Sequence, residues 1–300
     1  MSDQATVEVA GRQLKLSNLS KILYPDAGFT KADVIGYYAA VAPVLLTHCA
    51  HRCVTFRRFP NGVDGTSFFE KRCPSHRPEW VGTADGPGDH NGTIGYCRLE
   101  EPAALAWAGN MAAIELHAPM AHASDIESPD LVVFDLDPGP GTTITECAEI
   151  GLWIRDTLEG IGLRCWPKTS GSKGMQVYVP LNSTHTHEHA SAFALAVAQV
   201  MEAAHPTLVV TTQAKAARKD KVLIDWSQNS RHKTTISVYS LRARPRPTVS
   251  TPVTWDEVAE AADGAPLTFE AADVLARVEE HGDLFADTLT VVQQLPDVPS

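Results

Sequence analysis

The stretch "VVFDLDPGPG", residues 132–141, decides the fold because an apolar strand ends in two charged side chains. Residues i and i+2 of a strand point to the same face, so Asp135 and Asp137 should project together. Two like charges about 4 Å apart repel by about 4 kcal/mol at an effective dielectric near 20. The Pro-Gly run at 138–141 ends the strand. The pair is therefore expected at a strand end, either as a metal site or as a solvated turn.

The overall composition indicates a globular protein with a substantial core. The chain has 300 residues, of which 44% are hydrophobic. It has no apolar run near 18 residues and no secretory signal pattern at its start, so we expect no membrane association and a cytoplasmic protein. Its six cysteines are too sparse for a disulfide framework, which favours a reducing compartment.

The charge is distributed unevenly. The net charge is −11, but residues 251–300 hold eleven acids and one base and account for −10 of it. Residues 211–246 carry nine bases against Asp220 and Asp225. A local basic surface can bind phosphates whatever the total charge, although composition alone is equally typical of a solvated, mixed-charge face.

Hydrophobic periodicity predicts interleaved helices and strands, which indicates an α/β or α+β protein. Helices are expected at 30–45, at 145–158 with Thr145 as its cap, and at 188–204, 255–262 and 269–280. Strands are expected at 52–59, 131–136, 175–179, 221–226 and 234–241.

A third carboxylate, Asp225, also ends an apolar strand. If that strand lies beside 131–136, three carboxylates converge at one sheet edge. Such oxygen donors suit hard divalent cations, and two metal ions are the usual device for in-line phosphoryl transfer. The glycine-rich segment "KTSGSKG" at 168–174 supplies hydroxyls, backbone amides and Lys173 as anion ligands. It is not a Walker A motif, so taken alone it is a weak signal.

Taken together, these and further segments resemble the polymerase domain of bacterial multifunctional DNA ligase D and its stand-alone primase-polymerase relatives, in the archaeo-eukaryotic primase superfamily. The resemblance covers about residues 14–258 in order. It rests on "LSNLSKILYPDAGFTKADV" (16–34), "RFPNGVDGTSFFEKR" (58–72), "IELHAP" (114–119), "FDLDPG" (134–139), "KTSGSKG" (168–174) and "IDWSQNSRHKTTISVYSLRARP" (224–245).

The resemblance implies an α+β primase-like core with a central, mostly antiparallel sheet flanked by helices and two lobes around a metal-binding cleft. It implies a single catalytic domain at 10–290 with tails at 1–9 and 291–300. The implied activity is template-directed addition of ribo- or deoxynucleotides at gaps or broken DNA ends, with recognition of a downstream 5′-phosphate. The implied cofactors are two divalent ions, Mn²⁺ or Mg²⁺. The implied partners are gapped or broken DNA, NTPs and dNTPs, Ku, and ligase and phosphoesterase modules.

The same resemblance assigns roles to individual residues. The catalytic metal ligands would be Asp135, Asp137 and Asp225. The nucleotide would be held by His117, Ser170, Lys173, Gln228 and Arg242. The 5′-phosphate and DNA would be contacted by Asn18, Lys21, Lys31, Arg57, Arg58, Phe68, Phe69 and Arg218. Without the resemblance, the two lysines would be ordinary surface residues, His117 a core histidine, and one of the two phenylalanines a core residue.

One position departs from the family pattern. Many relatives have histidine two residues after the second glycine of the loop, where this chain has Gln176. Glutamine can donate a hydrogen bond to a phosphate oxygen but cannot carry charge. We therefore expect no nucleotide role for Gln176 and an altered triphosphate affinity.

Three alternatives remain on sequence grounds. The histidines and cysteines at 48–76 could form a zinc knuckle, although their spacing is loose and buried thiols are the simpler interpretation. An aspartate-nucleophile phosphatase also places DxD after a strand, but it needs Thr or Val where Gly139 stands. A non-catalytic module that bridges DNA ends would have no need for three clustered carboxylates.

Overall fold

The computed structural model describes residues 3–88 and 92–297 and divides the chain into two compact units. Unit 1 contains the chain up to Pro119 together with Ile236–Ser250 and Phe269–Gly282. Unit 2 contains Met120–Thr235, Thr251–Thr268 and the chain from Asp283 onward.

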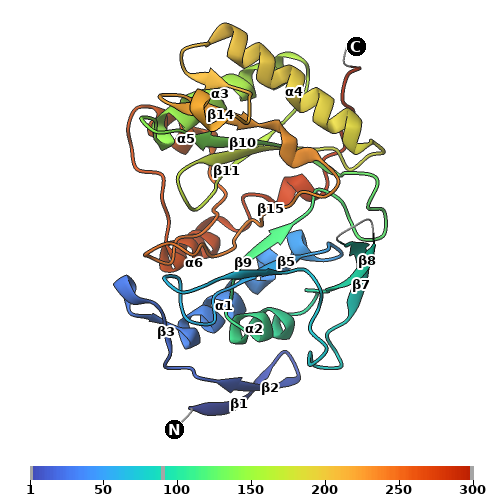
Figure 1. Ribbon diagram of the computed structural model, residues 1–300, viewed down its shortest axis with the longest axis vertical. Coiled ribbons are helices and arrows are strands. Elements are labelled where there is room, and N and C mark those ends of the chain that lie inside the picture. Colours follow the sequence, from blue (N-terminus) through green and yellow to red (C-terminus); the bar gives the residue numbers. More distant parts are fainter. Residues whose placement is uncertain (1–2, 89–91, 298–300) are drawn as a thin grey trace. The chain divides into compact units, whose positions relative to one another are not determined.

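Unit 2 is built on a five-stranded sheet (Figure 1). Its strands, in spatial order, are β11 (Trp166–Thr169), β12 (Met175–Pro180), β10 (Leu131–Pro138), β14 (Val222–Asp225) and β13 (Val209–Val210). Neighbours pair antiparallel except β13 and β14, which pair parallel. Strand β14, which ends in Asp225, lies beside β10, so the condition for the three carboxylates to converge at one edge is met.

Helices cover one face of this sheet. Helices α3 (Ile144–Gly160) and α4 (His187–Ala204) both contact β10, and α5 (Trp255–Ala262) packs on α3. Phe134 of β10 meets Phe193 of α4 with ring centroids 6.5 Å apart. Because side chains alternate along a strand, the packing of Phe134 and Leu136 in the core directs Asp135 and Asp137 to the opposite face.

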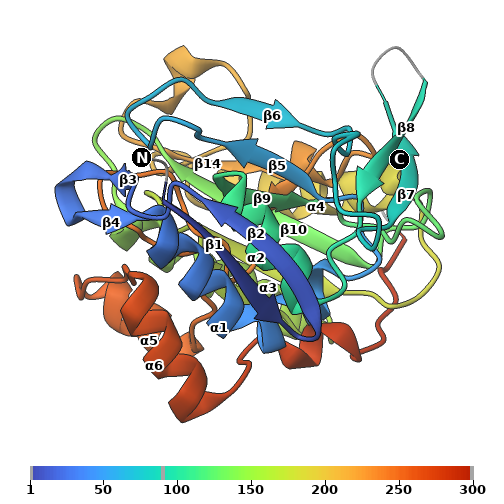
Figure 2. The same cartoon turned by 90° about the horizontal axis from the view of Figure 1, so that it is seen from below.

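The sheet of unit 1 has the order β15 (Thr235–Ile236), β9 (Ala113–Ala118), β5 (Thr55–Arg58) and β6 (Phe68–Glu70). Strand β5 pairs antiparallel with both β9 and β6 (Figure 2). Helices α1 (Lys31–Cys49) and α2 (Pro102–Asn110) pack on each other, and Trp107 of α2 lies against Phe56 of β5. The remaining elements of the unit are α6 (Ala271–His281) and the hairpins β1–β2 (Gln4–Val9, Arg12–Ser17), β3–β4 (Ile22–Tyr24, Phe29–Thr30) and β7–β8 (Thr83–Pro87, Thr93–Cys97).

The α+β class and the mostly antiparallel sheets are confirmed, with three local differences. Helix α3 is capped by Thr143, whose hydroxyl accepts from the Thr145 amide, so the expected cap at Thr145 is wrong. The expected strand at 234–241 is reduced to β15, because Tyr239 has φ 64°, which an extended strand cannot contain. Residues 4–9, which the resemblance assigns to a tail, form strand β1.

Among the described residues, one helix, α1, is long and apolar enough to cross a membrane by length and composition. This is weak evidence, because core helices of water-soluble proteins meet the same criterion. In the structure α1 packs along α2, and its residues Val34, Tyr38 and Val41 are fully buried.

Asn229 fixes the short helical turn η4 (Trp226–Asn229) to strand β10. Its fully buried side chain accepts from the Val133 amide at 2.8 Å and donates to the Val133 carbonyl at 2.8 Å. It also donates to the Trp226 carbonyl at 2.9 Å. The turn that follows Asp225 is therefore bonded directly to the strand that carries Asp135.

We expect Asn229→Ala to destabilise the protein by about 2–4 kcal/mol, because it leaves buried backbone groups of β10 unpaired. Urea unfolding followed by circular dichroism measures this loss. Asn61→Ala is the matched control, since Asn61 is exposed and should cost less than about 0.5 kcal/mol. Equal stability of the two variants would contradict the role assigned to Asn229.

Candidate active site and nucleic-acid interface

A row of polar side chains crosses four strands of the unit 2 sheet. Lys168 of β11 is opposite Gln176 of β12, which is opposite Asp135 of β10, which is opposite Asp225 of β14. Residues directly opposite each other share a face of the sheet. We call Lys168, Gln176, Asp135 and Asp225 the cross-strand row.

The pKa of Asp135 is strongly shifted by the surroundings of its carboxyl group in this row. Burial and the charge of Asp137 raise its pKa to about 7, with a further contribution from Asp225. A hydrogen bond from Gln176 and the charge of Lys168 oppose this rise. Lys168 donates to Gln176 Oε1 at 2.5 Å, and both side chains are buried. Gln176 therefore links a buried ammonium to the carboxyl of Asp135.

Asp225 is held by four hydrogen bonds. Its Oδ1 accepts from Gln213 Nε2 at 2.9 Å and from the amide and hydroxyl of Ser227 at 3.0 and 2.6 Å. Its Oδ2 accepts from Gln228 Nε2 at 2.9 Å. Arg218 donates in turn to the carbonyl and side-chain oxygens of Gln213 at 2.8 and 3.1 Å. The orientation of Asp225 is thus fixed, with Oδ2 the less occupied oxygen.

Two glycines allow close backbone contacts around the strand end that carries the exposed Asp137. A Cβ on Gly139 would lie 1.8 Å from the Arg218 carbonyl oxygen, and one on Gly174 would lie 2.0 Å from the Leu136 carbonyl oxygen. No larger residue fits at either position without a shift of the backbone. The turn after β10 and the loop before β12 are therefore packed directly against neighbouring chain.

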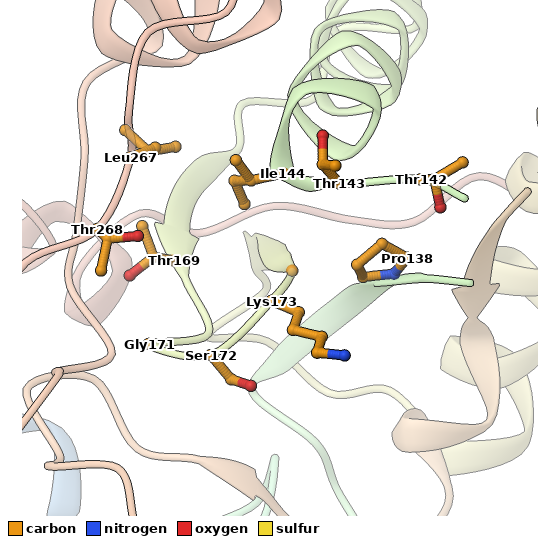
Figure 3. Close-up of a pocket in the computed structure, with 11 residues that line it drawn as sticks. Pro138, Thr142, Thr143, Ile144, Thr169, Gly171, Ser172, Lys173, Leu267 and Thr268 are labelled. Atoms are coloured by element: carbon orange, nitrogen blue, oxygen red, sulfur yellow. The ribbon is translucent and has the colours of Figure 1, made fainter. Parts of the chain in front are cut away.

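The loop between β11 and β12 presents potential anion ligands. Ser170 Oγ accepts from the amides of Ser172 and Gly174 at 3.3 Å each, so its own proton is directed to another acceptor. Lys173 is exposed. The loop lines a cavity of about 300 Å³ together with the start of α3 and residues 267–268 (Figure 3). Lys173 and several hydroxyls from Thr142, Thr143, Thr169, Ser172 and Thr268 line this cavity.

In unit 1, His117 and Arg242 share a buried partner, Glu115, that the sequence analysis did not single out. Glu115 Oε2 lies 3.0 Å from His117 Nε2, and its Oε1 lies 3.3 Å from Arg242 Nε. The segment "IELHAP" could have indicated this partner, because Glu115 and His117 are two residues apart in a strand and therefore share a face. Lys168 and Gln213 were also not anticipated.

The residues expected at a 5′-phosphate lie near one another in unit 1. Lys31 is buried and donates to the Ser17 carbonyl at 2.7 Å, while Lys21 donates to Asn61 Oδ1 at 3.0 Å. Burial, followed by the charges of Lys21 and Arg58, lowers the pKa of Lys31 to about 8. Asn18 precedes them with φ 55°, a left-handed conformation that asparagine tolerates well. Lys31 is therefore not an ordinary surface lysine.

Phe68 and Phe69 are both exposed, at 44% and 58%, so neither ring belongs to the core. The guanidinium of Arg58 lies 5.3 Å from the centre of the Phe68 ring, and that of Arg57 lies 5.4 Å from the centre of the Phe69 ring. Cation–π contacts of this kind keep aromatic rings oriented at a surface. The strands β5 and β6 thus present two ring–cation pairs.

The predicted site residues fall into two groups. His117, Arg242, the two phenylalanines, Arg57, Arg58 and the 5′-phosphate residues belong to unit 1, while the aspartates, Ser170, Lys173, Gln228 and Arg218 belong to unit 2. Within residues 3–88 and 92–297, no three His, Cys, Asp or Glu side chains are gathered closely enough to form a ready-made metal site. The three aspartates share a sheet edge and influence one another without forming such a cluster.

The cysteines differ from the expectation of free thiols. Cys73 and Cys97 form a disulfide with Cα atoms 4.8 Å apart, which joins the segment after β6 to β8. Cys49 and Cys53 are free and buried. A zinc knuckle at 48–76 is not supported, because one of its proposed ligands is in the disulfide and the part of the chain that the structure describes has no metal-ligand cluster.

Comparison with known proteins identifies relatives over nearly the whole chain. The multifunctional non-homologous end joining protein LigD of Mycolicibacterium smegmatis is 43% identical over 277 residues, covering 91% of this chain and 36% of that protein. The corresponding DNA repair protein LigD of Mycobacterium tuberculosis is 41% identical over 303 residues, covering 95% of this chain and 39% of that protein. This chain therefore spans well under half the length of these curated relatives.

A solved structure agrees with these matches. The polymerase domain of ligase D from Mycobacterium tuberculosis, in complex with DNA, aligns with a TM-score of 0.86 and 40% identity and covers 93% of this chain and 99% of that one. Residues 30–285 match the family described as "LigD, primase-polymerase domain". This chain belongs to the LigD primase-polymerase domain family of nucleotidyltransferases.

Proposed function

We propose that this protein adds nucleotides, directed by a template, at gaps and broken DNA ends during end joining or gap filling. The observation that carries the proposal is the pairing of Asp135 with Asp225, with Asp137 two residues further along, on the sheet face opposite α3 and α4. A non-catalytic module that bridges DNA ends would gain nothing from carboxylates that repel both each other and DNA phosphates. Because this chain spans only part of its relatives, Ku and ligase or phosphoesterase modules are proposed as partners of the longer assembly.

Asp135, Asp137 and Asp225 would hold divalent cations, Mn²⁺ or Mg²⁺. The donor chemistry fits, because carboxylate oxygens are the ligands that these hard ions prefer. The raised pKa of Asp135 supports the same assignment, since a nearby cation would favour the ionised carboxylate that burial and Asp137 disfavour. When bound, such ions activate a primer hydroxyl and neutralise charge at the reacting phosphate.

Further residues of the two units have separate roles in the proposal. Ser170 and Lys173 bind phosphate oxygens of the incoming nucleotide through a hydroxyl proton and an ammonium. His117 and Arg242 bind phosphate oxygens from unit 1. Gln213 and Ser227 keep Asp225 in one orientation. Gln228 binds the sugar.

A second set of residues binds DNA without reading its sequence. Asn18, Lys21 and Lys31 hold a downstream 5′-phosphate, and Phe68 and Phe69 stack on template bases, a contact worth about 1–3 kcal/mol per base. Arg57, Arg58 and Arg218 contact the DNA backbone. Stacking and phosphate contacts suit an enzyme that must accept any DNA end.

The decisive experiment is primer extension on gapped duplexes with and without a downstream 5′-phosphate, using ribo- and deoxynucleotides with Mn²⁺ or Mg²⁺. We expect primer extension that follows the template and is stronger when the 5′-phosphate is present. No extension on any substrate, with DNA binding intact, would favour the bridging module instead.

We expect Asp135→Asn to abolish nucleotide addition and to raise the midpoint of thermal unfolding at pH 8 in the absence of divalent cations. The pKa of Asp135 lies above that of an unfolded aspartate, so its carboxylate opposes folding fully above about pH 7, and that cost declines as the pH falls from about 7 to about 4, where the unfolded aspartate also takes up its proton. Thermal unfolding with and without Mn²⁺ measures both effects: Mn²⁺ should stabilise the wild type and have little effect on the variant. Near-wild-type extension by Asp135→Asn or Asp137→Ala with Mn²⁺ would refute the assignment of these carboxylates.

We expect the preference for 5′-phosphorylated gaps to weaken as the pH rises from 7 to 9. The pKa of Lys31 in the free protein is about 8, so binding a phosphate dianion above that pH requires proton uptake by Lys31. Fluorescence anisotropy with matched phosphorylated and unphosphorylated gaps measures the preference. Lys31→Ala should remove both the preference and its pH dependence, and it should reduce the salt dependence of binding by about one unit of log–log slope.

The exposed Lys15 of β2 provides the control for this experiment. Lys15→Ala should keep the preference and its decline with pH. Equal losses of affinity by Lys31→Ala on both substrates would show that Lys31 does not recognise the 5′-phosphate.

We expect a modest preference for ribonucleotides, on the order of tenfold or about 1.4 kcal/mol. Gln228 Nε2 donates a hydrogen bond to Asp225, which leaves the side-chain carbonyl oxygen of Gln228 to accept from a 2′-hydroxyl. Gln228→Ala should lower the ribo/deoxy ratio of kcat/KM more than it lowers deoxynucleotide use. Gln213→Ala is the control, because it removes a hydrogen bond to the same Asp225 and should leave the ratio unchanged. A clear deoxynucleotide preference in the wild type would refute the role assigned to Gln228.

A further inference from the structure

Glu115 lies at the centre of a charged cluster in unit 1. Its side chain is 1% exposed, and its two oxygens meet four donors. Oε2 lies 3.0 Å from His117 Nε2 and 3.4 Å from Arg57 Nη1. Oε1 accepts from the Ala243 amide at 3.1 Å and lies 3.3 Å from Arg242 Nε.

The cluster keeps Glu115 ionised. Burial alone would raise the pKa of Glu115, but the hydrogen bond from His117 and the charge of Arg242 outweigh it and lower the pKa to about 2. An ionised carboxylate has no proton to donate. The hydrogen bond between the two side chains therefore requires that Nε2 of His117 carry the proton.

The proton on Nε2 determines whether Nδ1 of His117 can donate or accept a hydrogen bond. A neutral imidazole has one protonated nitrogen and one lone pair, so the neutral ring presents a lone pair at Nδ1. Burial is the largest cause that lowers the pKa of His117 in the free protein, and together with the charges of Arg242 and Arg57 it outweighs the opposing effect of Glu115. A phosphate oxygen is also an acceptor, so the neutral ring cannot bind it through Nδ1.

We propose that Glu115 is the positioning residue of the nucleotide-phosphate site, fixing His117 so that the ring binds a phosphate oxygen only by taking up a proton at Nδ1. Glu115 also holds Arg242 through Oε1 and the following backbone through the Ala243 amide. The inference rests on the proposed role of His117 and Arg242 in binding nucleotide phosphates, and it adds a protonation step to that role.

The charges that face His117 determine the direction of the effect. Arg242 and Arg57 oppose its protonation, whereas Glu115 favours it. The Phe69 ring, whose centre lies 5.5 Å from that of His117, contributes no titrating group. A bound triphosphate adds negative charge and should raise the pKa of His117 in the complex. Nucleotide affinity should therefore fall as the pH rises through the pKa of His117 in the complex.

Calorimetric titration with a non-hydrolysable nucleoside triphosphate and Mg²⁺ tests the proposal. Titrations at about pH 7 in buffers of different ionisation enthalpy give the number of protons taken up on binding. His117→Asn is the reference, because asparagine donates a hydrogen bond without gaining a proton. The wild type should take up more protons than His117→Asn, by up to about one. Glu115→Gln should lose this excess and raise the nucleotide Kd at least about tenfold.

Two controls separate positioning from loss of fold. Glu101→Gln removes a partly exposed carboxylate that pairs with Arg12 in the same unit, and it should keep the wild-type Kd and proton count. Thermal unfolding of Glu115→Gln establishes whether the variant is folded. If it is not, the comparison of wild type with His117→Asn still decides, since it involves no change at Glu115.

The outcomes distinguish this inference from the proposed function. Equal proton uptake by wild type and His117→Asn, or an unchanged Kd in folded Glu115→Gln, would overturn the role of Glu115. If His117→Ala and Arg242→Ala also left the nucleotide Kd unchanged, the proposed phosphate-binding role of those residues would fail as well.

Discussion

The repulsion between carboxylates at the end of β10 is the constraint on which the rest of unit 2 depends. Asp135 is opposite Asp225 and two residues from Asp137, so the folded chain concentrates negative charge at one sheet edge. The cross-strand row partly offsets this through Gln176 and the buried Lys168. What the row leaves uncompensated is a local demand for positive charge, and such a demand is what distinguishes a cation-binding edge from a solvated turn.

In unit 1 the signs of the charges are reversed: a buried negative charge partly offsets a cluster of basic side chains. There a single buried carboxylate, Glu115, sits among Arg57, Arg242 and His117. Excess positive charge remains around it, partly exposed on Arg57. Each unit thus holds the side chains of its proposed site against an opposite charge that is too small to neutralise them.

Much of this arrangement could be predicted from the sequence. Apolar strands that end in aspartates indicated that three carboxylates would meet at one edge if β14 lay beside β10, and the structure shows that pairing. The partners of those carboxylates were less accessible. Lys168 and Gln176 lie in separate strands, and only the register of two strand pairs brings them into line with Asp135. Tyr239 ended an expected strand through its backbone conformation, which alternating hydrophobicity does not reveal. The Cys73–Cys97 disulfide likewise depends on the segment after β6 meeting the end of strand β8 rather than on spacing.

The glycines at 139 and 174 have a further consequence for how this protein can change. Each lets one segment touch the backbone of another, so the loop at 168–174, the turn at 138–141 and the segment at 218–221 pack on one another as a single piece. A loop transplanted from a relative would fit only if the end of β10, on which the loop packs, were transplanted with it. If Lys173 and Gln228 have the roles proposed for them, altered nucleotide selectivity is therefore more accessible through these side chains, which leave this backbone packing intact, than through exchange of the loop.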